Sequence, residues 1–313
     1  MATLRLTRST WIADGVVELE LRDPADALLP EWSPGAHLTL GLTPTLSREY
    51  SLCGDPADRS RYAVAVQREP ASRGGSAHVH DSLRLGTLLE VEGPKNNFEL
   101  EDAPAHILVA GGIGITPISA MARLLHARGA DWRLLYAGRA RRGMAFADEL
   151  AALGRDRVTI HADDEHGGPP DLAEFLATAP SHSLVYCCGP EPLMAALEAR
   201  LDDPARLRVE RFRAPADPAA AASAGTEEPF EVVCGDRRFT VPPGVSIMAT
   251  LRAGGVQIPS SCEEGICGTC ETKVIEGTPD HRDYLLTDAE RAANTVLMPC
   301  VSRSLSARLV LDL

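Results

Sequence analysis

Alternation of apolar and polar residues marks several short segments in the first hundred residues. From Val17 to Leu21 every second residue is apolar and the residues between are glutamates, which is typical of a half-buried β-strand. Similar strands are expected at HLTLGL (37–42), YAVAVQ (62–67) and LLEVEG (88–93). Because glycine and proline separate these segments, the pattern predicts a small antiparallel β-barrel.

From about residue 104 the pattern changes to apolar strands that alternate with helical segments. HILVAGG (106–112) has the composition of a buried strand, and PISAMARLLHARG (117–129) that of a helix that starts at proline and ends at glycine. Further strands are expected at WRLLYAG (132–138), VTIHADD (158–164) and SLVYCCG (183–189). Strands that alternate with helices predict a doubly wound parallel sheet.

A flexible linker is predicted for residues 214–229, because this stretch is rich in alanine and proline and lacks a sustained apolar face. An alanine-rich helical turn within it is the alternative. The residues that follow have the size of a compact domain of their own. The predicted organisation is therefore a barrel (1–102), an α/β domain (103–213), the linker and a C-terminal domain (230–313).

The formal net charge of −13 argues against nucleic acid or an anionic membrane surface as the main partner. Hydrophobic residues make up 44% of the 313 residues, enough to fill a core in each domain. The N-terminus has no apolar signal core, and no stretch reaches the roughly 18–20 apolar residues of a membrane span. We therefore expect a cytoplasmic protein, in which the eight cysteines do not form disulfides.

Four of the cysteines have the spacing of a metal-cluster site. In the motif SSCEEGICGTC, four residues separate Cys262 from Cys267 and two separate Cys267 from Cys270. Cys300 follows after 29 more residues. This spacing is that of a plant-type [2Fe–2S] cluster, which the four thiolates would ligate.

The loop that carries three of these cysteines also contains Gly265 and Gly268, which allow the unusual backbone conformations that wrapping a cluster requires. A four-cysteine zinc site is the alternative, although structural zinc normally uses two C-x2-C pairs and only one is present. The segment from residue 230 resembles plant-type ferredoxin domains, which implies a β-grasp fold. FEVV (230–233), VPPGVSIMATLRAGGV (241–256) and the ligand loop follow each other in that family's order.

Two loops of the α/β region point to a dinucleotide. GGIGITP (111–117) lies between a predicted strand and a helix, where backbone amides and the helix dipole face a pyrophosphate. CGPEPLM (188–194) ends a later strand, and the pair resembles the ferredoxin–NADP reductase superfamily, in which both loops line the nicotinamide cleft. The residues that this resemblance implies are Gly111, Gly112, Gly114, Thr116, Pro117, Cys188, Gly189 and Pro190.

By the same resemblance Cys188 is a catalytic candidate that lies near the carbon that gives up hydride. A small buried residue at a strand end is the other interpretation of Cys188. The remaining cysteines, Cys53, Cys187 and Cys234, have no partner spacing and are expected to be buried apolar residues.

The type of nicotinamide depends on Arg139, Arg141 and Arg142, which follow the predicted strand at 132–138. An arginine at that place favours the 2′-phosphate of NADPH, whereas solvated loop charges favour neither nucleotide. Members of the subfamily that this chain resembles mostly use NADH. NADH is therefore expected, with NADPH as the alternative.

Two motifs in the barrel region suit a flavin. REYS (48–51) places an aromatic side chain where it can lie on an isoalloxazine face and a serine hydroxyl, a second catalytic candidate, at the ring edge. ASRGGS (71–76) supplies amides and a second arginine for a terminal phosphate. The order of the motifs resembles the same superfamily, which implies as flavin ligands Arg48, Tyr50, Ser51, Arg73, Gly74, Gly75 and Ser76.

The whole chain resembles the phthalate dioxygenase reductase family, such as vanillate demethylase-type reductases, in the order of its flavin, nicotinamide and [2Fe–2S] domains. This resemblance implies FMN, with FAD as the alternative. It also implies an aromatic residue that shields the flavin, for which Phe212 is the candidate; a core residue of the last strand is the other interpretation. The PDHRD segment (279–283) resembles the family too, and a surface contact is the role considered for it.

The implied activity is that of an electron-transfer reductase, in which NADH reduces FMN by hydride and the cluster passes single electrons to a partner. The expected partner is the terminal oxygenase of a multi-component system, in particular a Rieske non-haem iron enzyme that acts on an aromatic compound. A cytochrome P450 is the alternative recipient.

Three other interpretations fit less of the sequence. A dihydroorotate dehydrogenase electron-transfer subunit has a shorter cluster segment. A non-enzymatic redox sensor needs neither the flavin nor the nicotinamide loops, and a flavin reductase with a vestigial tail would not keep four intact cluster ligands.

Overall fold

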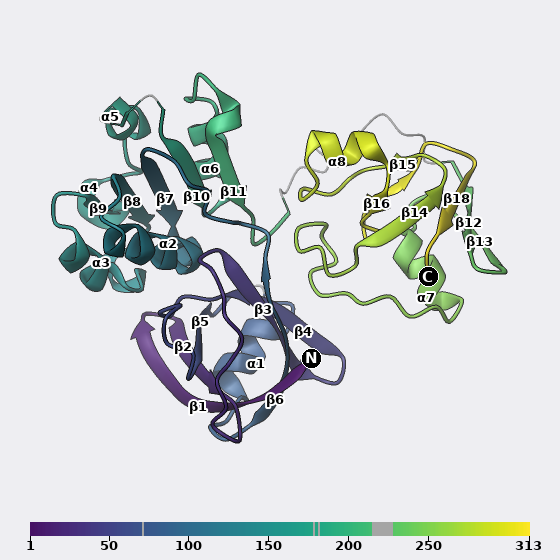
Figure 1. The fold of residues 1–313 in the computed structure, drawn as a ribbon, viewed down its shortest axis with the longest axis horizontal. Coiled ribbons are helices and arrows are strands. Elements are labelled where there is room, and N and C mark those ends of the chain that lie inside the picture. Colours follow the sequence, from purple (N-terminus) through teal and green to yellow (C-terminus); the bar gives the residue numbers. More distant parts are fainter. Residues whose placement is uncertain (71, 178, 181, 215–227) are drawn as a thin grey trace. The chain divides into compact units, whose positions relative to one another are not determined.

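The computed structural model describes residues 1–70, 72–177, 179–180, 182–214 and 228–313, and the chain forms two compact units (Figure 1). The first unit spans Met1–Arg211 and the second Phe212–Leu313. The predicted linker, residues 214–229, lies almost entirely outside the described residues. None of the helices in the described part of the chain is long and apolar enough to cross a membrane.

Six antiparallel strands form the first sheet, in the spatial order β4-β3-β6-β1-β2-β5. They are β1 (Ala2–Ala13), β2 (Val16–Arg22), β3 (Ala36–Thr43), β4 (Leu46–Ser51), β5 (Tyr62–Gln67) and β6 (Leu88–Asn96), with helix α1 (Gly75–Asp81) between the last two. Just beyond β4, Leu52 pairs with Val64 of β5, so the two outer strands meet. The sheet closes around an interior filled mainly by leucine and valine side chains, which confirms the predicted antiparallel barrel.

One residue of the barrel departs from the alternation seen in the sequence. The alternation in β2 places Glu20 on the solvent side of the strand, but Glu20 is only 7% exposed. Its carboxylate lies 3.5 Å from Arg8 and 3.1 Å from Arg61. A buried carboxylate needs such charged partners, and the two arginines stand on neighbouring segments of the same face.

Five parallel strands form the second sheet of the first unit, in the order β11-β10-β7-β8-β9. They are β7 (His106–Gly111), β8 (Trp132–Gly138), β9 (Val158–Ala162), β10 (Leu184–Cys188) and β11 (Leu207–Glu210). The connections contain α2 (Ile115–Ala127), α3 (Ala147–Leu153), α4 (Asp163–His166), α5 (Leu172–Ala177), α6 (Glu191–Glu198) and the short 3-10 turns η1 (Gly112–Gly114), η2 (Arg141–Gly143) and η3 (Pro204–Arg206). The predicted doubly wound sheet is confirmed.

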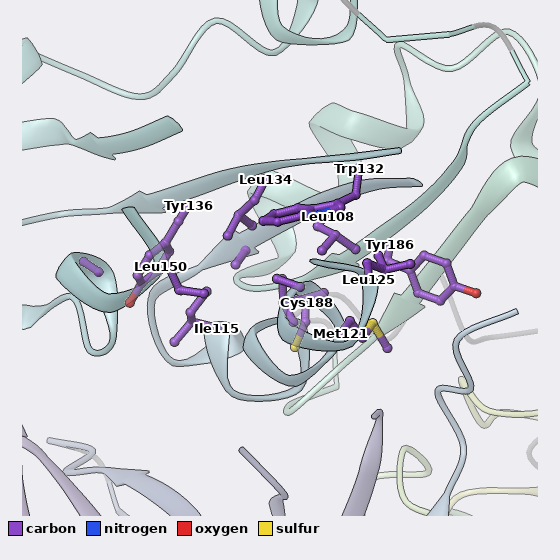
Figure 2. Packing of buried hydrophobic residues seen from close by; sticks show 14 of the residues in the cluster. Leu108, Ile115, Met121, Leu125, Trp132, Leu134, Tyr136, Leu150, Tyr186 and Cys188 are labelled. Atoms are coloured by element: carbon purple, nitrogen blue, oxygen red, sulfur yellow. The ribbon is translucent and has the colours of Figure 1, made fainter. Parts of the chain in front are cut away.

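Separate apolar cores cover the two faces of this sheet. Leu108 and Ala110 of β7 belong to one core, and Ile107 and Val109 belong to the other. Both faces are buried, which is why the strands are apolar at nearly every position. Figure 2 shows the first core, in which residues of α2 and α3 lie against strand residues that include Leu108, Leu134, Tyr136 and Cys188.

Helix α2 starts at Ile115, two residues earlier than the sequence pattern suggested. Pro117 therefore occupies the third position of the helix. The first four amide groups of a helix have no partner within it, so a proline there removes no hydrogen bond. The earlier start extends the helix to the end of the glycine turn.

The second unit is a β-grasp domain with five strands in the order β13-β12-β18-β14-β16. They are β12 (Phe230–Cys234), β13 (Arg237–Val241), β14 (Thr272–Glu276), β16 (Val296–Leu297) and β18 (Arg308–Leu311), and β15 (Pro279–Asp280) pairs with β17 (Arg303–Ser304) apart from them. Helices α7 (Ile247–Ala253) and α8 (Asp288–Ala293) complete it. Ile247, Met248 and Leu251 bury one face of α7 in the domain core.

The Tyr186 side chain of β10 binds the segment that connects β6 of the barrel to β7 of the parallel sheet. Its hydroxyl accepts a hydrogen bond from the Glu101 amide at 2.8 Å and donates one to the Glu99 carbonyl at 3.0 Å. Tyr186→Phe leaves both backbone groups without that partner, so we expect a loss of about 1–3 kcal/mol in the free energy of unfolding. Denaturant unfolding followed by tryptophan fluorescence reports on the first unit, because all three tryptophans lie there.

Tyr62→Phe is the matched control for that measurement. Among the described residues, the Tyr62 hydroxyl donates one hydrogen bond, to the Pro30 carbonyl at 2.7 Å. We expect this variant to lose less stability than Tyr186→Phe. Equal losses would contradict the role given to the Tyr186 hydroxyl.

Candidate functional site

The two nicotinamide loops predicted from the sequence are in contact with each other. Gly111 ends β7, and Cys188 ends the neighbouring parallel strand β10, where it pairs with Ala110. A Cβ atom on Gly114 would lie 2.2 Å from the Cys188 carbonyl oxygen, and one on Gly189 would lie 2.9 Å from the Gly111 amide nitrogen. Only glycine allows this approach, at the carboxyl ends of the strands where parallel sheets bind ligands.

Two residues predicted to contact the dinucleotide, Thr116 and Cys188, have side chains that are buried within the protein. Thr116 is only 1% exposed, and its hydroxyl donates to the Ile113 carbonyl at 3.0 Å. Its side chain therefore shapes the glycine turn, and the turn's amides are the groups that can face a ligand. Cys188 is buried, and burial, with the nearby Glu210 carboxyl as a second cause, raises the pKa of its thiol, so that it stays protonated.

The flavin motifs, which begin 23 residues apart in the sequence (71 − 48), meet at Arg48. Its guanidinium Nη2 donates to the Arg73 carbonyl at 2.7 Å. A Cβ atom on Gly75 would lie 2.6 Å from the Arg48 Cγ, so the side chain lies directly over the glycine loop. Ser76 closes that loop, because its hydroxyl accepts from the Glu69 amide at 3.1 Å.

The two other residues of the strand motif differ in environment. Tyr50 packs partly against the barrel core, and burial, opposed by the Arg48 charge, raises its pKa to about 12. Ser51 is 5% exposed and its hydroxyl hydrogen-bonds the Glu210 carboxyl. Phe212, two residues after Glu210, is 39% exposed, so it is not the core residue that was the other interpretation.

Glu210 is a candidate site residue that the sequence reading missed. It is the last residue of β11 and lies opposite Cys188 in the parallel pairing with β10. Although the residue is partly exposed, its Oε2 atom is buried and has no hydrogen-bond partner among the described residues. Burial, with the charge of Glu49 as a second cause, raises its pKa to about 8, and the hydrogen bond from Ser51 opposes the rise.

This carboxyl connects the barrel with the nicotinamide loops. Ser51 comes from the flavin strand and Cys188 from the nicotinamide loop, and both lie beside Glu210. The signal in the sequence was an acid at the carboxyl end of a strand of the same parallel sheet. In this part of the chain only Phe212, two residues after Glu210, is a candidate from the sequence analysis.

Two of the three arginines after β8 pair with acids through their side chains, and the third, Arg139, is exposed. Arg141 pairs with Asp148, and the Arg142 Nε lies 3.3 Å from the Asp14 carboxylate. The Arg139 carbonyl accepts from the Asp164 amide at 3.1 Å. Helix α4, which follows β9 at the same edge, carries three acids in its first turn: Asp163, Asp164 and Glu165.

The four predicted cluster ligands form two pairs in the second unit. The Sγ atoms of Cys270 and Cys300 are 3.3 Å apart, and the thiol of Cys267 hydrogen-bonds that of Cys262. Within the described part of the chain, no group of three or more histidine, cysteine or acidic residues is arranged to hold a single metal ion. Two pairs fit a two-iron cluster, in which each iron takes two cysteines, better than a zinc ion that needs four ligands at once.

The loop that carries three of the ligands packs on the PDHRD segment. A Cβ atom on Gly265 would lie 2.6 Å from Cγ2 of Val301 and 3.1 Å from Cα of Asp283. The Tyr284 amide donates to the Gly265 carbonyl at 2.9 Å. Asp280 and Asp283 are each 1% exposed, so these two acids are buried, whereas His281 and Arg282 are partly exposed and the surface contact considered from the sequence stays a prediction.

Comparisons with known proteins cover the whole chain. Residues 231–305 match the family described as 2Fe-2S iron-sulfur cluster binding domain. The chain is 46% identical to phenoxybenzoate dioxygenase subunit beta of Ectopseudomonas oleovorans, with 99% of this chain and 97% of that protein covered. It is 40% identical to phthalate dioxygenase reductase of Burkholderia cepacia, again with 99% and 97% covered.

Two solved structures share this fold. A phthalate dioxygenase reductase, described as a modular structure for electron transfer from pyridine nucleotides to [2Fe–2S], matches with a TM-score of 0.72 at 40% identity and covers 99% of this chain and 97% of that one. An intact type IV self-sufficient cytochrome P450 monooxygenase matches with a TM-score of 0.88 at 41% identity. This chain spans 41% of that longer protein. The matches confirm the predicted three-part fold and the [2Fe–2S] character of the C-terminal domain.

The pKa of Glu210 generates a prediction about stability. Because the folded-state value of about 8 lies above the ordinary value of 4.5, the buried carboxyl contributes stability that is complete below pH 4.5 and is lost as the pH rises through about 8. Glu210→Gln removes this dependence. We compare the two proteins without flavin, between about pH 5 and about pH 8. The free energy of unfolding should fall less steeply with pH in the variant than in the wild type, and the two slopes should differ by up to about 1.4 kcal/mol per pH unit.

Denaturant unfolding followed by tryptophan fluorescence measures this slope. Glu90→Gln on the exposed side of the barrel is the control, because it removes one carboxylate that no described element buries. The control should follow the wild-type slope. Identical slopes for all three proteins would show that Glu210 ionises at an ordinary pH.

Proposed function

The chain belongs to the phthalate dioxygenase reductase family, and from this membership we propose that it transfers electrons from NADH through FMN and a [2Fe–2S] cluster to a terminal oxygenase. It is an oxidoreductase and a reductase component of an oxygenase system, as its relatives are. The cofactors expected from the sequence are those of this proposal. The observation that carries it is the meeting of Ser51, Glu210 and Cys188, because it joins the flavin strand to the nicotinamide loop at one point.

The bound groups supply the redox chemistry: a hydride from NADH, its conversion to single electrons at FMN, and one-electron transport by the cluster. The protein residues bind and orient them. In the proposal, amides of Gly111, Gly112 and Gly114 hold the dinucleotide. Gly189 and Pro190 border the nicotinamide.

The barrel residues have the corresponding task for the flavin. Arg48, Arg73 and the amides of Gly74 and Gly75 bind its phosphate, which a guanidinium pair suits through charge-assisted hydrogen bonds. Tyr50 would lie on one face of the ring, and the family resemblance implies Phe212 as the residue that would shield it. This compact phosphate site favours FMN over FAD in the proposal.

The residues at the meeting point are held without charge near neutral pH. With a pKa of about 8, Glu210 keeps its proton, and the raised pKa of Cys188 keeps its thiol neutral. A fixed negative charge there would oppose the arrival of electrons. The Ser51 hydroxyl, bonded to Glu210, is then free to orient toward a ring edge on its other side.

The partner is proposed to be a Rieske non-haem iron oxygenase that acts on an aromatic compound. This rests on relatives named for phenoxybenzoate dioxygenase and phthalate dioxygenase. The second candidate is a cytochrome P450. It is favoured by one observation, the match of the whole chain to part of a self-sufficient cytochrome P450 monooxygenase.

Anaerobic titration of the purified protein with NADH, followed by its visible spectrum, tests the electron path. We expect both the flavin and the iron–sulfur absorbance to be lost. The variant Cys300→Ser removes one ligand of the pair with Cys270, so NADH should still reduce its flavin while transfer to a cluster-dependent acceptor becomes slow. A wild-type spectrum that NADH leaves unchanged would overturn the proposal, and normal transfer in the variant would overturn the ligand assignment.

The choice of NADH over NADPH follows from charge at the sheet edge. The acids of α4 would repel a 2′-phosphate, and Arg141 is already paired with Asp148. In the double variant Asp163→Asn/Asp164→Asn we expect the ratio of kcat/KM for NADPH to that for NADH to rise about tenfold at low salt, or about 1.4 kcal/mol. Glu90→Gln, a remote change of one charge, should leave the ratio unchanged; a double variant that behaves like it would place the 2′ site elsewhere.

A further inference from the structure

A continuous chain of hydrogen bonds runs from the flavin side of the first unit to the nicotinamide turn. The Arg123 Nη1 of α2 donates to the Cys53 carbonyl at 2.7 Å and to the Ser119 hydroxyl at 3.4 Å. The Ser119 hydroxyl donates to the Thr116 carbonyl at 2.9 Å, and the Thr116 hydroxyl donates to the Ile113 carbonyl at 3.0 Å. Ser119 and Thr116 are almost completely buried, so no water competes for these bonds.

Both ends of this chain are anchored close to candidate site residues. Cys53 follows Ser51 by two positions, and its amide donates to the Ala63 carbonyl at 2.9 Å, which fixes it in the barrel wall. Ile113 lies inside the glycine turn between Gly112 and Gly114. Its side chain packs on a shared apolar cluster of barrel and α/β residues: Ala13, Val16, Cys53, Ala63, Ala65 and Ala145.

The Arg123 guanidinium is oriented from two further sides. Its Nε donates to the Glu149 carboxylate at 2.9 Å, and its Cζ lies 5.6 Å from the ring centre of Phe146. The side chain is only 21% exposed. An arginine held at so many points is rigid, unlike most surface arginines, whose ion pairs contribute little.

We propose that Arg123 is a positioning residue for hydride transfer, which holds the nicotinamide turn at a fixed distance from the flavin strand. The inference rests on the proposed function, because it needs both cofactors at the sites described above. Hydride transfer depends steeply on the distance between donor and acceptor, and a displacement of about 1 Å costs about a hundredfold in rate. Arg123 touches neither cofactor site; it acts through the carbonyls of Cys53 and, by way of Ser119 and Thr116, Ile113.

The test compares full-length holoprotein variants in stopped-flow flavin reduction. In Arg123→Met we expect the limiting rate of flavin reduction by NADH to fall at least about tenfold. The Kd for NADH should stay within about twofold, and the long-wavelength absorbance of the nicotinamide–flavin complex should weaken. Reduction of the cluster by dithionite, which needs no hydride, should be unchanged.

Arg128→Met is the matched control, because Arg128 caps the same helix and, within the described part of the chain, its ion pair is with the exposed Asp102, at 3.6 Å. It should reduce its flavin at the wild-type rate. Ser119→Ala is the second variant. It breaks the middle of the chain with a small change, and we expect its rate to fall about threefold to tenfold while its thermal midpoint stays close to that of the control.

Three outcomes overturn the inference. Wild-type rates in both Arg123→Met and Ser119→Ala would show that the chain does not position the turn. A fall in rate that follows the loss of thermal stability, with unchanged long-wavelength absorbance, would show that Arg123 only stabilises the fold. A wild-type protein whose flavin NADH does not reduce would overturn the proposed function itself, and the inference with it.

Discussion

The contact between Gly114 and the Cys188 carbonyl is the constraint on which the proposed nicotinamide site depends. The two strands that lead into it are neighbours in a parallel sheet, so their following loops leave from the same edge. A side chain at Gly111, Gly114 or Gly189 would push these loops apart. With them in contact, the glycine turn, Cys188 and Glu210 lie at the carboxyl ends of neighbouring strands. The rest of the first unit, from the buried Thr116 to the barrel wall at Cys53, holds this turn in place.

Much of this fold follows from local patterns in the sequence. The strands of the barrel and of the parallel sheet were predictable because one-sided burial imposes a period of two, and burial on both faces imposes continuous apolar runs. The candidate cluster ligands could be named from the sequence because their chemistry demands cysteine at a characteristic spacing. The glycine turn after β7 was also predictable, because three glycines in four residues indicate a tight turn with close backbone approach.

What the sequence did not reveal depends on pairs of residues distant along the chain. Glu20 was expected in solvent, and only the fold shows that Arg8 and Arg61 lie over it. Glu210 has an unusual pKa because of burial and Glu49, more than 160 residues away in sequence. Thr116 was expected at the dinucleotide, whereas its hydroxyl is used within the turn. The pairing of the four cysteines, two by two, likewise depends on where the strand before Cys300 runs, which the spacing alone does not state.

Charge is arranged consistently along the proposed electron path. Each carrier accepts negative charge when it works, so an unpaired carboxylate or thiolate beside it would raise the cost of reduction. In the first unit Glu210 and Cys188 avoid that cost by keeping their protons.

In the second unit Asp280 pairs with Arg282 at 2.8 Å, and Asp283, next to the ligand loop, lies 3.7 Å from Arg291. The chain carries a net charge of −13, yet the carboxyls of Glu210, Asp280 and Asp283 are either protonated or matched by arginine. In the first unit burial removes the unpaired negative charge, and in the second unit ion pairing with arginine does so. Burial suits a site that must stay apolar for hydride transfer, and ion pairing suits a loop that must be held rigidly around a cluster.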